Sequence, residues 1–449
     1  MKKILLLFVS IFVFSCAKAD SLLEEGVVIR DAEIEDILKS YIDPLFEKAH
    51  LNKKDLNLVL LVKKEVNAAA SINTTLILNS GFLLRTTNLD EVIGVLAHEV
   101  GHLEGRHIIR MLDAMDQAQK RGMLSVAVGI ALGLLTQRPD LGAAIAVGSN
   151  ISNIYALLSY NRSEEASADQ AAVRYLNELC WPADGLATFF EKLLGQELLS
   201  SSLQDPYVRS HPLTKDRLNA VREQIKSSCQ RPFPKKMIEN YKVLKIKLEA
   251  FLMPPAYVLS RNSGTTALAQ YAQSIAYYRQ GKLNPSIKLL NSLLSKNPNN
   301  PYYHELKGQI FYESGKLKPS IQSYRAAFSL KPDDVLFQIG LAQSLISINT
   351  KPSLEEAEKL LEKAQKKEPQ NITIWQLLSM SYGRLKKMGA MALSLAEKAA
   401  LLNKWDEADD QVIRALHFLK KNDYLYLRAQ DLQIQTKREK SKATQTPRL

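Results

Sequence analysis

Two histidines and a glutamate stand at a spacing suited to metal chemistry in the stretch LAHEVGHLEGRH, Leu96 to His107. In a helix, His98 and His102 lie four residues apart and share one face. Both imidazoles can therefore approach one ion at about 2.0–2.1 Å. Glu99 cannot bind in the same way, but it can take a proton from a water beside the ion. The neighbours are mostly apolar, and a buried His-Glu-His group without a metal would be costly, so the pattern predicts a metal site rather than a chance motif on a surface helix.

His107, a third histidine in this stretch, is a weaker candidate. Extended zinc motifs place their third ligand ten residues after the first, and although Gly105 matches the glycine of such motifs, position 108 is Ile. In one continuous helix, His107 follows His98 by nine residues and lies on the opposite face. The spacing predicts that His107 is a surface or helix-packing residue and that the third ligand comes from elsewhere.

The acidic run NRSEEASAD offers the best third ligand. Glu165 and Asp169 are one helical turn apart, so Glu165 can bind the ion while Asp169 holds a ligand histidine in the correct tautomer. Glu164 is the competing ligand, but it has no acidic partner four residues on; a solvated acidic face is the remaining alternative. The two histidines with Glu165 would leave a fourth position open, as in catalytic zinc sites, with one Zn²⁺ per chain.

The elements that must position these groups are mainly helical. One long helix is expected from an N-cap at Asn88 through the metal motif to about residue 112. Gly122 to Tyr160 is rich in Gly and Ala and almost uncharged, which favours a tightly packed helical hairpin; the alternative is a mobile or membrane-touching lid. Other patterns predict helices at 31–50 and 161–179 and strands at 56–64 and 74–79.

The C-terminal half repeats itself. GKLNPSI at Gly281 recurs as GKLKPSI at Gly315, 34 residues later, and Pro298 recurs as Pro332 at the same interval. A period of this length is typical of tetratricopeptide (TPR) helix pairs. Prolines on either side of a helical run mark a domain junction between about 231 and 257.

The N-terminus reads as an export signal, with two lysines followed by an apolar run. Cleavage after Ala17-Lys18-Ala19 would release a soluble protein, whereas a lipobox ending at Cys16 would leave a lipid-bearing cysteine. Export implies an oxidising compartment. There, Cys180 and Cys229 would either form one disulfide or remain two separate buried thiols.

The formal net charge of +12 is spread along the chain apart from a short C-terminal run. No cluster combines basic and aromatic residues in the way of nucleic-acid modules, so we expect no nucleic-acid partner. Weak attraction to an anionic membrane or envelope surface fits the charge better.

HEVGH followed by EASAD resembles the gluzincin metallopeptidases of the group that includes the CAAX prenyl proteases and HtpX. The export signal, the SHPLTKDR segment and the TPR repeats look most like its periplasmic, BepA-like branch, over roughly residues 30 to 430. The resemblance implies zinc, endopeptidase chemistry and a role in outer-membrane protein assembly or quality control. It assigns His98, His102 and Glu165 as ligands, Glu99 as the base and Asp169 as a partner of a ligand histidine.

Two further sites follow from the resemblance. His211 looks like the family histidine that approaches the metal, either to stabilise the transition-state oxyanion or as a reversible fourth ligand that keeps the enzyme latent; a plain turn histidine is the alternative. Family members carry NAF on an edge strand that pairs with substrate. This chain reads Asn67-Ala68-Ala69, so Asn67 and Ala68 are the substrate-binding candidates without the aromatic.

The expected fold is mainly α: a helical zinc metallopeptidase domain with a small β-sheet, followed by an all-α TPR-like solenoid. The expected function is an exported, periplasmic zinc endopeptidase of the cell envelope that acts on misfolded or stalled proteins, with repeats that dock substrates or the outer-membrane assembly machinery. The alternative is a TPR chaperone or scaffold with latent proteolysis, and outer-membrane association is expected if Cys16 is lipidated. The expected divisions are a signal peptide at 1–19, the peptidase domain at 20–230, a helical junction at 231–265, TPR repeats at 266–436 and a basic tail at 437–449.

Overall fold

The computed structural model describes residues 27–120, 162–200 and 203–445. The predicted signal peptide with Cys16, and the predicted hairpin or lid from Gly122 to Tyr160, lie outside the described residues. The chain divides into two compact units, with the division between Val258 and Leu259. No helix in the described ranges is both long and apolar enough to cross a membrane.

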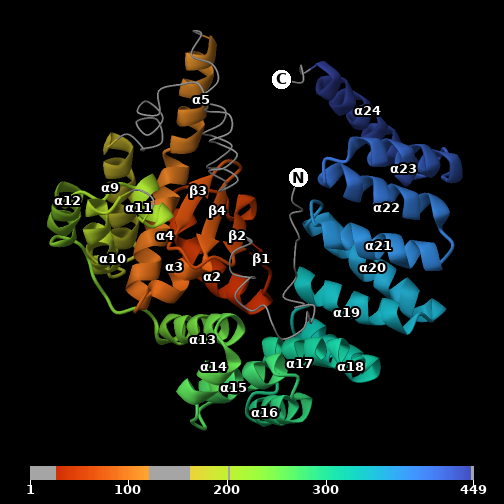
Figure 1. The fold of residues 1–449 in the computed structure, drawn as a ribbon, viewed down its shortest axis with the longest axis horizontal. Helices are drawn as coiled ribbons and strands as arrows, with labels where there is room; N and C mark the ends of the chain where they lie inside the picture. Colours follow the sequence, from red (N-terminus) through yellow and green to blue (C-terminus); the bar gives the residue numbers. More distant parts are fainter. Residues whose placement is uncertain (1–26, 121–161, 201–202, 446–449) are drawn as a thin grey trace. The chain divides into compact units, whose positions relative to one another are not determined.

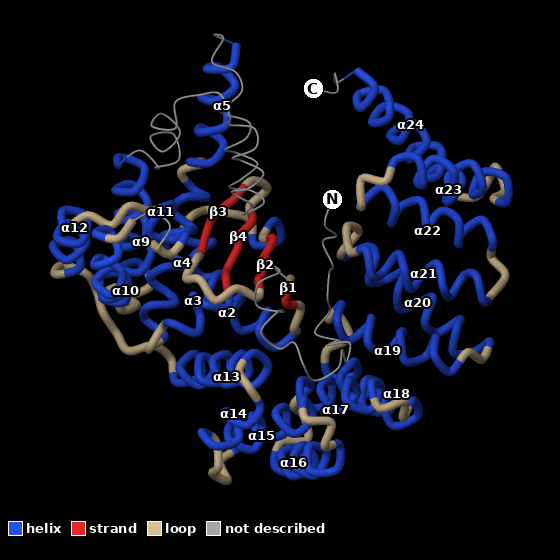
Figure 2. Tube along the Cα trace, in the orientation of Figure 1, coloured by secondary structure: helices blue, strands red, loops and turns tan. Residues whose placement is uncertain are grey.

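The first unit contains a four-stranded sheet of order β1-β2-β4-β3 (Figure 2). β4 pairs with β2 in parallel and with β3 in antiparallel register, Ala68 lying opposite Leu78. The backbone amide of Asn79 donates to the backbone carbonyl of Asn67 at 2.9 Å. Because hydrogen-bonded and non-bonded pairs alternate along an antiparallel ladder, residues 67, 69 and 71 bond to β4, while the backbone N–H and C=O groups of Ala68 and Ala70 point to the open edge of the sheet. The strands are β1 (Val28–Ile29), β2 (Asn57–Leu61), β3 (Ala68–Ser71) and β4 (Thr75–Asn79).

Helices surround this sheet and bury one continuous apolar core with it (Figure 1). The helices of the first unit are α2 (Ala32–Lys48), α3 (Ser80–Arg85), α4 (Leu89–Glu104), α5 (His107–Lys120), α9 (Arg162–Glu178), α10 (Asp184–Leu194), α11 (Pro206–Ser210), α12 (Lys215–Ile225) and α13 (Lys235–Leu252), and α14 (Pro255–Arg261) spans the division between the two units. α4 is the central member, because nearly all of its residues up to His102 are buried.

The predicted single helix through the metal motif is wrong at its C-terminal end. α4 begins as expected, with the Asn88 side chain accepting from the Glu91 amide. It ends at Glu104, because Arg106 adopts a left-handed conformation with φ of 49°, which a right-handed helix cannot contain. His107 then starts a new helix, α5, so the helical angle between His98 and His107 does not apply.

α13 packs onto the first unit although it follows the metal-site elements in the chain. The Lys247 ammonium is buried and lies 2.8 Å from Asp31 and 3.0 Å from Glu33. The Lys245 ammonium donates to three carbonyls at the end of α3, those of Leu83, Leu84 and Thr86. These contacts fix α13 against α2 and α3, where its apolar side is covered.

One disulfide joins Cys180 to Cys229 in the first unit. Cys180 follows the end of α9, and Cys229 follows α12. Of the two alternatives that the sequence left open, the structure has the bonded pair.

The second unit is a series of antiparallel helix pairs, which confirms the predicted TPR-like solenoid. Gly281 and Gly315, which open the repeated heptapeptides, have φ of 73° and 71° and end the first helix of two successive pairs. The bounds are α15 (Ala267–Arg279), α16 (Leu283–Lys296), α17 (Pro301–Glu313), α18 (Leu317–Leu330), α19 (Val335–Ile348), α20 (Lys351–Lys367), α21 (Ile372–Arg384), α22 (Met388–Leu401), α23 (Trp405–Phe418) and α24 (Tyr424–Gln445).

Candidate metal centre

The α4 motif places two imidazoles and one carboxylate in the core. His98, Glu99 and His102 are all buried, and the Nε2 atoms of the two histidines lie 3.0 Å apart. This is the arrangement expected from the i, i+4 spacing, because side chains four residues apart stack on one helical face.

α9 brings Glu165 to this pair. Its Oε2 lies 3.5 Å from His98 Nε2, and its Oε1 lies 3.4 Å from His102 Nε2. The close approach of α4 and α9 depends on Gly101, because a Cβ there would lie 2.9 Å from the Ala168 carbonyl oxygen. The glycine inside the motif is therefore required by packing rather than by chemistry.

His211 completes a group of four. It follows α11, with Nδ1 3.0 Å from Glu165 Oε1 and 3.4 Å from His98 Nε2. The Tyr207 ring, one helical turn earlier, packs against the His211 ring at a centroid distance of 4.7 Å and holds it in place. One ligand atom from each of the four side chains falls within 4.8 Å of the others.

The donor set fits zinc. Ligands at about 2.1 Å from a tetrahedral ion are separated from each other by about 3.4 Å. The distances of His98 to His102 and His211, and of Glu165 to the three histidines, run from 3.0 to 3.5 Å, and all four donor atoms lie within 4.8 Å of one another. Two or three imidazoles with one carboxylate is also a donor combination that zinc accepts. The side chains therefore have the types and separations that a Zn²⁺ site requires.

Glu99 lies beside the four converging side chains and contacts the sheet. Its Oε2 accepts from the Ala70 amide of edge strand β3 at 2.8 Å. Its Oε1 accepts no hydrogen bond from the described part of the chain and lies 3.6 Å from His211 Nε2. Burial raises the pKa of Glu99, which makes this carboxylate a better proton acceptor than an exposed glutamate.

Asp169 and Arg217 form an outer layer around the donors. Asp169 Oδ1 lies 2.8 Å from His98 Nδ1, the nitrogen that faces away from the donor group. The Arg217 guanidinium donates to both Asp169 oxygens and lies 2.8 Å from Glu165 Oε2. Burial alone would raise the pKa of Asp169, but the contacts with His98 and Arg217 outweigh it and lower that pKa, so the carboxylate stays ionised.

Sequence reasoning missed Arg217. It stands in the SHPLTKDR segment, on α12, and reaches two acidic residues of α9 that precede it by about fifty positions. Neither the residue type nor the polar helix around Arg217 indicates a role at the metal site. The sequence pointed to it only through its position shortly after the His-Pro pair.

His107 is a helix-packing residue, the second of the two predicted alternatives. It is fully buried rather than at the surface, and its Nδ1 is 2.8 Å from His102 Nδ1. A Cβ on Gly105 would lie 2.2 Å from the His107 ring, so the glycine makes room for this contact. His107 therefore touches the outer nitrogen of His102 and is not one of the four converging residues.

The remaining candidates occupy two places. Glu164 lies 3.4 Å from Arg110 near the surface and is not among the four. Asn67 directly precedes edge strand β3 and Ala68 begins it. The Asn67 side-chain oxygen is buried and accepts no hydrogen bond from the described residues, while the backbone groups of Ala68 face the open edge.

Comparisons with known proteins agree with this geometry. Residues 29–225 match the model of Peptidase family M48. The chain is 24% identical over 390 residues to the beta-barrel assembly-enhancing protease of Escherichia coli (strain K12), with 83% of this chain and 77% of the relative covered. It is 24% identical over 378 residues to the protein of the same name from Yersinia pestis, with 80% and 76% covered.

Among solved structures, yeast Tom70 aligns over 79% of this chain and 85% of its own, with 13% identity and a TM-score of 0.32. The family match, the sequence relatives and the buried His/Glu cluster together indicate what this chain is. This chain is a metallopeptidase in which residues 29–225 resemble Peptidase family M48, and it is similar to the beta-barrel assembly-enhancing proteases over most of its length.

Proposed function

We propose that this chain is a zinc endopeptidase of the bacterial cell envelope that cleaves polypeptides in the course of outer-membrane protein assembly. The convergence of His98, His102, Glu165 and His211 beside Glu99 carries the proposal. The names of the similar proteins support this process, and the N-terminal export signal expected from the sequence supports a periplasmic location.

The proposed chemistry divides the work among residues of the first unit. His98, His102 and Glu165 would hold Zn²⁺, and the bound ion would supply Lewis-acid chemistry toward the scissile carbonyl and a nearby water. Glu99 takes a proton from that water at its Oε1, the water oxygen adds to the carbonyl carbon, and Glu99 delivers the proton to the leaving amine as the C–N bond breaks. The outward groups of Ala68 would bind the substrate backbone as an added strand, beside Asn67.

The test is Glu99→Gln, which keeps the size of the side chain but removes the proton acceptor. We expect zinc content and thermal stability at wild-type level and cleavage of unfolded casein lowered by several orders of magnitude. A Glu164→Gln protein is the matched control. It carries the same chemical change at a glutamate of α9 that lies outside the donor group. Wild-type cleavage by the Glu99→Gln protein would refute the assignment.

A second candidate function is a repeat-based scaffold whose protease is latent, and the position of His211 favours it. With His211 Nδ1 as a donor, the chain itself would supply four ligands to a zinc ion, a number typical of structural rather than catalytic zinc. The two functions separate in a deletion strain. Full recovery of outer-membrane integrity by the Glu99→Gln protein would make scaffolding the main role, whereas no recovery would make it proteolysis.

A further inference from the structure

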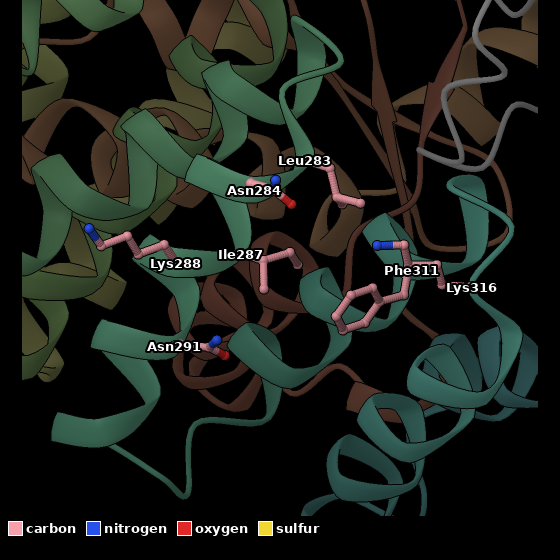
Figure 3. A pocket seen from close by; sticks show the side chains of 7 residues that line it. All are labelled: Leu283, Asn284, Ile287, Lys288, Asn291, Phe311 and Lys316. Atoms are coloured by element: carbon pink, nitrogen blue, oxygen red, sulfur yellow. The ribbon is translucent and has the colours of Figure 1, made fainter.

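The second unit contains a hollow that the peptidase chemistry does not use. It has a volume of about 320 Å³ and lies between α16 and the turn that joins α17 to α18. Figure 3 shows the side chains of Leu283, Ile287 and Phe311 facing this space, with the Lys316 ammonium beside Phe311. Asn284, Lys288 and Asn291 complete the lining from α16. The hollow therefore has an apolar floor and a rim of cations and amides.

The polar groups of this rim are free to bind a ligand. Within the described part of the chain, neither Lys288 nor Lys316 makes an ion pair, and the carboxamides of Asn284 and Asn291 make no hydrogen bond. All four residues are exposed. No acidic side chain is among the lining residues, so the charge of the rim is wholly positive.

In the following repeats, basic side chains form ion pairs with acidic side chains of the protein itself. Arg325, which corresponds to Asn291 one repeat earlier, lies 2.6 Å from Glu356. Lys367 lies 2.9 Å from Asp333, and Lys387 forms an ion pair with Glu358. In these repeats an acid of a neighbouring helix or turn neutralises the cation, whereas the cations at the hollow form no ion pair with any acid among the described residues.

We propose that this hollow, which we call the α16 pocket, binds an internal segment of a partner protein in which carboxylate side chains flank a large apolar side chain. The apolar side chain would cover Leu283, Ile287 and Phe311, removing apolar surface from water. The carboxylates would take the place of the missing acid at Lys288 and Lys316, and the two asparagines would bond the segment's backbone. A hollow this small, near the lower end of ligand sites at about 300–1,000 Å³, holds one or two side chains.

The inference depends on the docking role of the repeats but not on proteolysis. The probe is a fluorescein-labelled ten-residue peptide with both ends blocked, in which one Phe and one Leu stand between pairs of Glu. A second peptide replaces each Glu by Lys, and a third replaces Phe and Leu by Ser. Binding is followed by fluorescence anisotropy with the full chain carrying Glu99→Gln, which prevents cleavage of the probe.

We expect the acidic, apolar peptide to bind at least tenfold more tightly than either altered peptide, and more weakly as salt rises. Lys288→Gln combined with Lys316→Gln should raise its Kd at least tenfold, and so should Phe311→Ala. Lys366→Gln removes an exposed lysine of α20 that lies outside the pocket and should leave the Kd unchanged. Circular dichroism melting confirms that each variant is folded.

The proposal would be overturned if the doubly substituted protein bound the acidic peptide as tightly as the unsubstituted pocket does. It would also be overturned if the Lys-containing peptide bound as tightly as the acidic one. Binding only by a peptide with a free C-terminal carboxylate would also overturn it, since the proposal requires side-chain carboxylates within a segment. Failure of the peptidase proposal gives a different result: the wild-type chain would not cleave casein, while peptide binding would be unaffected.

Discussion

Arg217 holds Asp169 by two parallel hydrogen bonds, from Nε to Oδ2 at 2.8 Å and from Nη2 to Oδ1 at 2.9 Å. The same guanidinium donates to the Pro212 carbonyl at 2.8 Å and lies over the Phe190 ring. Asp169 in turn contacts His98. The segment that carries His211 and the helix that carries Glu165 are thus joined by a planar, two-pronged ion pair that lysine cannot reproduce.

Arg217→Lys should therefore weaken zinc binding although Arg217 is not one of the donors. Residues in such outer positions typically change metal affinity by about 10–100-fold, and we expect a loss in this range, with a larger loss for Arg217→Met. Competition with a chromophoric chelator measures it. Arg209→Lys, an exposed change two residues before His211, is the control. An unchanged affinity in Arg217→Lys would show that the ion pair only stabilises the fold.

Glu165→Gln should empty the site, because it removes the one carboxylate among the four converging side chains. Metal analysis after dialysis should find little zinc, whereas Glu164→Gln should keep it. His107→Ala should lower the affinity by about tenfold, since His107 contacts the outer nitrogen of His102. A site emptied by His107→Ala but retained in Glu165→Gln would reverse the roles assigned to these two residues.

His211→Ala distinguishes the two roles of this histidine. If His211 is a fourth ligand, its removal opens a position for water, so basal cleavage of casein should rise several-fold while zinc affinity falls modestly. The distances of His211 Nδ1 to Glu165 and His98 favour this result. If His211 instead stabilises the oxyanion, turnover should fall by about 10²–10³-fold. An unchanged rate would contradict both roles.

Lys247→Met should destabilise the first unit, because it leaves Asp31 and Glu33 without their buried cation. Breaking a buried ion pair in this way typically costs about 3–5 kcal/mol of unfolding free energy. Lys242→Met, at an exposed position of α13, should change the free energy of unfolding by less than about 0.5 kcal/mol. Urea denaturation of both variants measures the difference, and equal midpoints would show that α13 is not anchored through Lys247.

The metal motif was predictable because its chemistry is local. The i, i+4 spacing of His98 and His102 fixes their relative positions once the segment is helical, and the acidic pair one turn apart distinguishes Glu165 from Glu164. The repeats were predictable for a related reason: a period in the sequence becomes a period in space.

The parts that failed depend on tertiary structure. The end of α4 at Arg106 is a single backbone conformation that the apolar pattern does not reveal, and it changed the position of His107. The contacts of Arg217 cross from α12 to α9, and no spacing rule connects those positions. The choice between a disulfide and two free thiols required the distance between Cys180 and Cys229, which only the folded chain defines.

That disulfide makes the metal site sensitive to the compartment in which the chain folds. It links the end of the helix with Glu165 and Asp169 to the residues that follow the helix with Arg217. A bond that closes a loop of this length removes about 4 kcal/mol of chain entropy from the unfolded state. In a reducing cytoplasm the same residues converge without this support. If the chain is exported as proposed above, its affinity for zinc and its proteolytic activity should therefore be lower before export than after the disulfide has formed in an oxidising compartment.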